Sequence, residues 1–167
     1  MKRLRILLPL VALVAACARP PDRIQHGRWE LEIATTEIDA PGLPAELQQQ
    51  ARAALNQTKR ECVTPDNAAA NPLRVFWEQS TSNPGLTCQT SENVFSGGVI
   101  RFRSSCRNSD GTPGQLRVAL DGRYEAITLL ASMSLNAEAP NPNGSGTLSV
   151  RTRSTIRGRR VGDCARN

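Results

Sequence analysis

Apolar and polar residues alternate along most of this chain, and this period of two is typical of strands that bury one face of a sheet. Between residues 28 and 38, Trp29, Leu31 and Ile33 alternate with charged residues. The same period recurs in the second half of the chain, in residues 86–95, 99–105, 116–120, 127–135 and 148–156. Because no strand–helix–strand rhythm separates these segments, the pattern predicts a mainly β fold, a curved antiparallel meander or partial barrel.

Turn and helix signals divide the pattern further. Ser96-Gly97-Gly98 predicts a three-residue hairpin turn, and Asp121-Gly122 predicts a type I′ turn before the strand at 127–135. Thr64-Pro65-Asp66 resembles the N-terminal cap of a helix. The secondary structure of residues 72–79 is ambiguous, and residues 139–146 are a loop rich in Pro, Asn and Gly. A short helix at 44–56, with Pro44 in its first turn, should pack against the sheet through a narrow apolar stripe, Leu47, Ala51, Ala54 and Leu55.

The start of the chain has the order of an export signal. Residues 1–5 are basic, and the apolar run at 6–16 is too short to span a bilayer, which takes about 20 residues. Leu13-Val14-Ala15-Ala16-Cys17 is typical of a lipobox, so we expect residues 1–16 to be a lipoprotein signal peptide and Cys17 to carry palmitate or similar acyl chains. The alternative is ordinary cleavage at Ala16-Cys17-Ala18, which would leave a soluble periplasmic protein.

This reading sets the expected location and domain organisation. Ala18 rather than Asp follows Cys17, which by the sorting rule for bacterial lipoproteins favours the outer membrane. We expect the lipidated Cys and a linker at 17–27, one β-rich domain at 28–164 and a short tail at 165–167. The predicted location is the cell envelope, with the lipid anchor in the outer membrane and the domain facing the periplasm.

The net charge changes when the signal is removed. The whole chain has 21 basic and 15 acidic residues, and removal of Lys2, Arg3 and Arg5 leaves 18 against 15, a charge of +3. Half of the excess charge that would suggest a nucleic-acid partner is therefore discarded, and no aromatic-rich basic motif replaces it. We expect no nucleic-acid partner.

Four cysteines remain beyond the lipobox, and an even number in an oxidising compartment suggests two disulfides with three connectivities. Cys88 and Cys106 lie the same distance on either side of Gly97, so a three-residue turn would place them opposite each other. We predict Cys88–Cys106 and, by elimination, Cys62–Cys164. A zinc site is the alternative, but no cysteine pair has C-x-x-C spacing and the lone His26 lies near the tether.

The sequence contains no recognisable arrangement of catalytic residues. His26 is the only histidine, so a Ser-His-Asp or Cys-His device would depend on a residue at the linker edge. Glu30 and Glu32 share a strand face, which is more typical of a solvated surface than of a glycosidase pair. Gly144-Ser145-Gly146 indicates a loop rather than a nucleophile. We expect no enzyme, no catalytic residues, no cofactor and no metal.

Arginines form the one constellation that suggests a binding site. Four share the parity of the last strand and two form a shorter row at 99–105: Arg151, Arg153, Arg157, Arg159, Arg101 and Arg103. If the two strands are neighbours, these guanidinium groups form a cluster suited to phosphate or carboxylate groups. The alternative is a solvated face, partly neutralised by Glu30 and Glu32 if the first and last strands pair.

Four short motifs carry a family resemblance: Gly27-Arg28-Trp29-Glu30, Cys62-Val63-Thr64-Pro65, the turn-flanking Cys88 and Cys106, and Gly158-Arg159-Arg160-Val161-Gly162-Asp163-Cys164. Their order and spacing resemble the domain of unknown function 3617 family, mostly exported proteins of Gram-negative bacteria. The resemblance implies a small secreted β-rich domain with paired cysteines. It implies no reaction and no catalytic residues.

The expected function is that of a non-catalytic binding or structural lipoprotein near the outer membrane. Its expected partners are the membrane, reached through the lipid anchor, and an anionic envelope component or a partner protein. One alternative is a periplasmic carrier that holds an apolar or amphiphilic ligand in the curved sheet, for which the small residue Ala131 is a hint. Another is an enzyme with an unrecognised site.

Overall fold

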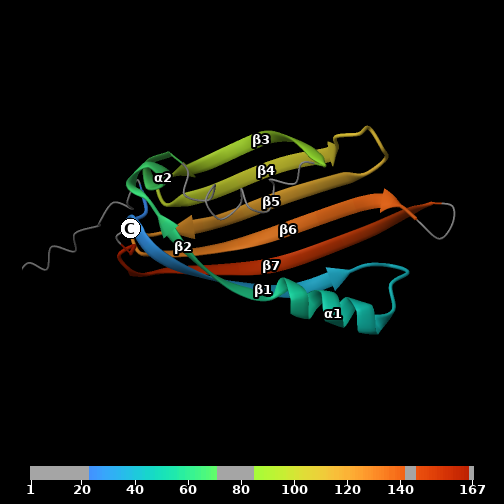
Figure 1. Cartoon of the computed structure of the whole chain (residues 1–167), viewed down its shortest axis with the longest axis horizontal. Coiled ribbons are helices and arrows are strands. Elements are labelled where there is room, and N and C mark those ends of the chain that lie inside the picture. Colours follow the sequence, from blue (N-terminus) through green and yellow to red (C-terminus); the bar gives the residue numbers. More distant parts are fainter. Residues whose placement is uncertain (1–22, 71–84, 142–145, 166–167) are drawn as a thin grey trace, which may run out of the picture.

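The computed structural model describes residues 23–70, 85–141 and 146–165. The expected signal peptide, Cys17, the ambiguous segment 72–79 and most of the Gly144-Ser145-Gly146 loop lie outside these ranges. The described residues contain one seven-stranded antiparallel sheet in the order β2-β1-β7-β6-β5-β4-β3 (Figure 1). Its strands are β1 (Gly27–Asp39), β2 (Gln57–Val63), β3 (Leu86–Ser96), β4 (Val99–Asn108), β5 (Gln115–Tyr124), β6 (Thr128–Pro140) and β7 (Thr147–Gly162). The predicted mainly β, antiparallel fold is confirmed.

Five consecutive strands, β3 to β7, form a meander, and β1 then pairs with β7. The first and last strands of the domain are therefore neighbours. The sheet is open, because β2 and β3 form its two edges and are not paired with each other.

The period of two separates two faces of the sheet. We call the face that carries Trp29, Leu31 and Ile100 the inner face, and all three side chains are almost completely buried there. Ala68, from the short helix α2 (Pro65–Ala70), and Ile24 belong to the same core cluster. A bulge between Thr35 and Glu37 shifts the parity of β1, so that Ile38 is also buried. Charged side chains occupy the opposite, outer face.

The predicted Asp121-Gly122 turn is wrong, because both residues lie inside β5. Gly122 has no positive φ, which a type I′ turn requires. It faces β6, where an added Cβ would lie 2.5 Å from the Leu130 carbonyl oxygen and 2.6 Å from the Ala131 Cβ. Glycine is therefore needed for close packing of two strands. The turn itself spans 125–127, where the Glu125 amide donates to the Thr128 carbonyl.

The Cys88–Cys106 disulfide forms as predicted, but by a different register. The turn has two residues, Gly97 and Gly98, both with positive φ, rather than three. Continued unchanged, that register would place Cys88 opposite Arg107. A bulge at Ser91, between Thr90 and Glu92, shifts it by one residue and brings the two cysteines opposite each other. The predicted Cys62–Cys164 disulfide also forms, and ties β2 to the end of the chain.

The first helix, α1 (Ala45–Leu55), forms where it was predicted but does not pack as expected. It lies beside β1 (Figure 1), yet none of its residues is buried and Leu47 remains 47% exposed. Gln48 attaches the helix through hydrogen bonds to the carbonyls of Ala40 and Leu43. The second helix agrees with its predicted cap, since the Thr64 hydroxyl accepts a hydrogen bond from the Asn67 amide.

The N-terminal segment joins the sheet before β1 begins. Ile24 is only 3% exposed, and the Gln25 amide donates to the Ala126 carbonyl at 2.7 Å. Residues 24–27 of the expected linker at 17–27 therefore belong to the folded domain, because Ile24 is buried in the core and Gln25 is hydrogen-bonded to the turn between β5 and β6. We call this end of the sheet, marked by Ile24, Gln25 and the 125–127 turn, the tether end.

Candidate functional site

The two predicted arginine rows lie on the same outer face but do not meet. Arg101 and Arg103 belong to β4, and the other four belong to β7. Strands β5 and β6 separate them, which places the rows about 14 Å apart at about 4.8 Å per strand. The expectation of one guanidinium cluster, which depended on neighbouring strands, is therefore not met.

The β7 row stands opposite the acidic residues of β1. Arg159 donates to Glu30 at 2.6 Å and Arg153 to Glu37 at 2.8 Å. The other two members are in register with acids as well, Arg157 with Glu32 and Arg151 with Asp39. This pairing of the first and last strands is the arrangement expected of a neutralised, solvated sheet face.

Glu30 is the centre of the strongest ionic group on this face. Its carboxylate accepts hydrogen bonds from Arg159 and, on the other side, from Arg60 of β2 at 2.9 Å. The hydrogen bond from Arg159, followed by that from Arg60, lowers the pKa of Glu30, and the same contact raises the pKa of Arg159. Glu30 links three strands, so its chemistry is structural.

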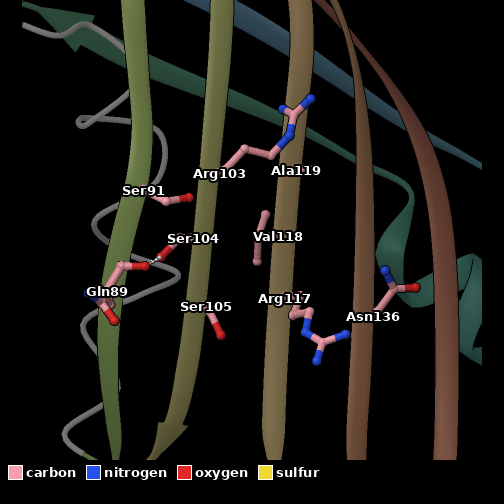
Figure 2. Close-up of a pocket in the computed structure, with 9 residues that line it drawn as sticks. All are labelled: Gln89, Ser91, Arg103, Ser104, Ser105, Arg117, Val118, Ala119 and Asn136. Atoms are coloured by element: carbon pink, nitrogen blue, oxygen red, sulfur yellow. Dashed lines mark hydrogen bonds between the residues drawn. The ribbon is translucent and has the colours of Figure 1, made fainter.

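The other half of the outer face carries a shallow hollow of about 450 Å³ over β3 to β6 (Figure 2). Nine residues line it, and its only charged side chains are two arginines: Gln89, Ser91, Arg103, Ser104, Ser105, Arg117, Val118, Ala119 and Asn136. The remaining polar groups are hydroxyls and amides, which donate or accept hydrogen bonds. The hollow therefore offers hydrogen-bond donors and positive charge without a lining carboxylate.

The two arginines of the hollow are held differently. Arg103 donates to both carboxylate oxygens of Asp121 at 2.8 Å and to the carbonyls of Phe102 and Leu120, so most of its donors are used. Arg117 donates to the Gln115 side-chain carbonyl at 2.9 Å. A guanidinium has five N–H donors. Within the described part of the chain, Arg117 therefore keeps donors that can reach a bound anion, while Arg103 supplies a fixed positive group nearby.

Arg117 is the residue that the sequence reasoning missed. The alternation of Leu116, Val118 and Leu120 already places Arg117 on the polar face of its strand. What the sequence does not show is that β5, and not β7, lies next to β4. The pairing of Ser105 with Arg117 across these strands brings Arg117 to the hollow.

Other predicted site residues have structural surroundings. The backbone carbonyl of His26 accepts a hydrogen bond from Arg160. Ala131 is 4% exposed and belongs to the core cluster, rather than lining an open cavity. In the described ranges, no three His, Cys, Asp or Glu side chains are grouped to hold a metal ion. No helix within those ranges is long and apolar enough to cross a bilayer.

An open antiparallel sheet with two disulfides and a polar outer face defines a small, cystine-crosslinked β protein. The model of the family described as "Protein of unknown function (DUF3617)" matches residues 24–164. The chain belongs to this family, which confirms the resemblance of its four motifs. Searches of curated proteins and of solved structures find no match to the chain.

Proposed function

We propose that the protein is a lipid-anchored, non-catalytic module of the cell envelope that binds an anionic group in its outer-face hollow. The ligand group is a phosphate or a carboxylate of an envelope component. Arg117 is its main contact, Arg103 adds fixed charge, and the hydroxyl and amide groups of Gln89, Ser105 and Asn136 bind neighbouring polar atoms.

The cysteines support export and anchoring. The two disulfides use Cys62, Cys88, Cys106 and Cys164, and such bonds persist in oxidising compartments. Cys17 is the one cysteine of five that these disulfides do not use, and it stands at the lipobox position. With the other four cysteines paired, Cys17 has no partner for a disulfide within the chain. Its position after Leu13-Val14-Ala15-Ala16 therefore favours acylation.

The observation that carries the binding proposal is the difference between the two arginine groups. On β7, arginines face acidic partners on β1, and pairs such as Arg153–Glu37 already satisfy their charge. Among the described residues, no carboxylate lines the hollow, and Arg117 is hydrogen-bonded only to the neutral side-chain amide of Gln115. Charge-assisted hydrogen bonds to an incoming anion are the strongest interactions left open there.

Titration of the isotope-labelled protein with inorganic phosphate and with acetate, followed by amide NMR shifts, tests the binding proposal. We expect shifts centred on Arg117–Ala119 and Ser105. R117Q should weaken binding about tenfold, since a hydrogen bond to a charged group contributes about 1.5–3 kcal/mol. R153Q, on the same face but paired with Glu37, is the matched control and should bind like the wild type. Equal losses in both variants, or no shifts near Arg117, would contradict the proposal.

A further inference from the structure

Three exposed apolar side chains gather at the tether end of the sheet. Ile127 lies in the turn between β5 and β6 and is 49% exposed, Leu130 on β6 is 55% exposed, and Val161 on β7 is 37% exposed. The Arg160 amide donates to the Ile127 carbonyl at 2.9 Å, so the end of β7 lies against this turn. Single exposed apolar residues are ordinary, but these three share one end of the molecule.

Arginines flank this apolar group in register. Leu130 pairs with Arg123 on one side and with Arg157 on the other, so all three occupy one row across the outer face. Among the described residues, neither Arg123 nor Arg157 takes part in an ion pair, although Glu32 of β1 stands opposite Arg157, whereas Arg153 and Arg159 of the same face are paired. The surface combines apolar side chains with available positive charge, which suits the interface of an anionic bilayer.

The length of the tether identifies what this surface can meet. Six residues separate Cys17 from Ile24, where the chain becomes part of the core, and the seven steps between the two Cα atoms span at most about 25 Å. Strand β6 has thirteen residues, so its far end lies twelve steps from its start, about 41 Å at about 3.4 Å each. An acyl-anchored chain therefore holds the tether end within about 25 Å of the bilayer, whereas the far end of β6 can lie beyond that reach.

We infer that Ile127, Leu130 and Val161, together with Arg123 and Arg157, dock the domain onto the anionic phospholipid surface that holds the acyl chains of Cys17. This inference rests on the lipid anchor of the proposed function. The apolar side chains enter the headgroup region, and the two guanidinium groups bind lipid phosphates. The docked domain has a fixed orientation, in which the outer face and its hollow turn toward the membrane.

Tryptophan depth quenching tests the docking on the whole lipidated chain, purified from membranes and placed in phosphatidylglycerol-containing vesicles. I127W and L130W put a fluorophore on the surface, and L47W is the matched control, because Leu47 is equally exposed on α1 at the opposite end (Figure 1). Vesicles with brominated acyl chains should reduce the added emission of I127W and L130W, relative to the wild-type background, and leave that of L47W unchanged.

The arginines are tested in the same vesicles. Adding R123Q and R157Q to I127W should reduce the quenching, while R151Q and R153Q, at the far end of β7, should leave it intact. Quenching of I127W should also weaken in high salt. A chain that floats with the vesicles but shows equal or no quenching at positions 127 and 47 overturns the docking alone. A chain that does not float overturns the lipid anchor and, with it, this inference.

Discussion

Glu30 shows how single side chains connect this sheet. Its carboxylate bridges Arg159 of β7 and Arg60 of β2, and these hydrogen bonds lower its pKa. A carboxylate with a lowered pKa stabilises the fold at neutral pH. This contribution starts to disappear as the pH falls to the unfolded value, about 4.3, and is gone below the still lower pKa of the folded state.

We predict that E30Q makes the free energy of unfolding less dependent on pH between pH 7 and pH 3. Urea unfolding of wild type and variant between pH 7 and pH 3 measures the difference. The wild type should be more stable at pH 7, and the two curves should converge as the pH falls. E32Q is the control, because Glu32 lies on the same strand face but forms no ion pair with another described residue. A wild-type profile for E30Q would show that these contacts do not contribute to folding.

Gly122 carries a second prediction at this scale. G122A places a Cβ against the backbone of β6, which cannot move aside easily, so we expect it to destabilise the protein by about 2 kcal/mol. D121N, at the adjacent residue, loses only an exposed ion pair and should cost at most about 1 kcal/mol. Denaturant midpoints compare the two, and a larger loss for D121N would contradict the close approach of β5 and β6 at Gly122.

At the scale of the element, the strands were predictable and their junctions were not. Alternation predicts which residues of β5, of β7 and of β1 before its bulge share a face, because that depends only on the local period of two. Asp121-Gly122 misled because its dipeptide signal is local, whereas the need for glycine comes from a neighbouring strand. The disulfide between Cys88 and Cys106 is predicted correctly although the predicted turn has three residues and the observed turn has two. The bulge at Ser91 shifts the register by one residue and so cancels the difference.

The same limit explains the candidate site. Arg103 was a predicted binding residue, but Arg117 was not, since its place beside β4 depends on strand order. The β7 arginines were predicted to bind anions or to be neutralised, and their pairing with β1 favours neutralisation. Helix α1 could be located from its periodicity, yet a narrow stripe of two leucines and two alanines did not determine how deeply it would pack.

The two disulfides should differ in their effect on stability. Cys62–Cys164 closes a sequence separation of 102 residues and Cys88–Cys106 one of 18. Loop-closure entropy gives about 5 kcal/mol for the first and about 3 kcal/mol for the second. We expect C62S/C164S to lower the melting temperature more than C88S/C106S, as measured by circular dichroism. The reverse order would show that native contacts, rather than loop length, determine these contributions.

At the scale of the whole molecule, the pairing of first and last strands brings both ends of the domain to one end of the sheet. Ile24 and Cys164 lie there, and the Cys62–Cys164 disulfide closes it. At this end β1 begins and β7 ends (Figure 1). A tether attached at this end leaves the hollow, about 20 Å further along β5, clear of the attachment point. The proposed anchor and the proposed binding site thus occupy separate parts of one rigid sheet.

Metabolic labelling with palmitate in a bacterial host tests the anchored envelope module most directly. We predict that the wild-type chain incorporates the label and sediments with membranes, that C17A does neither, and that C62S/C164S, the matched cysteine control, is still labelled. Non-reducing titration of C17A should find no free thiol. An unlabelled wild-type chain, or four reactive thiols in C17A, would contradict the account.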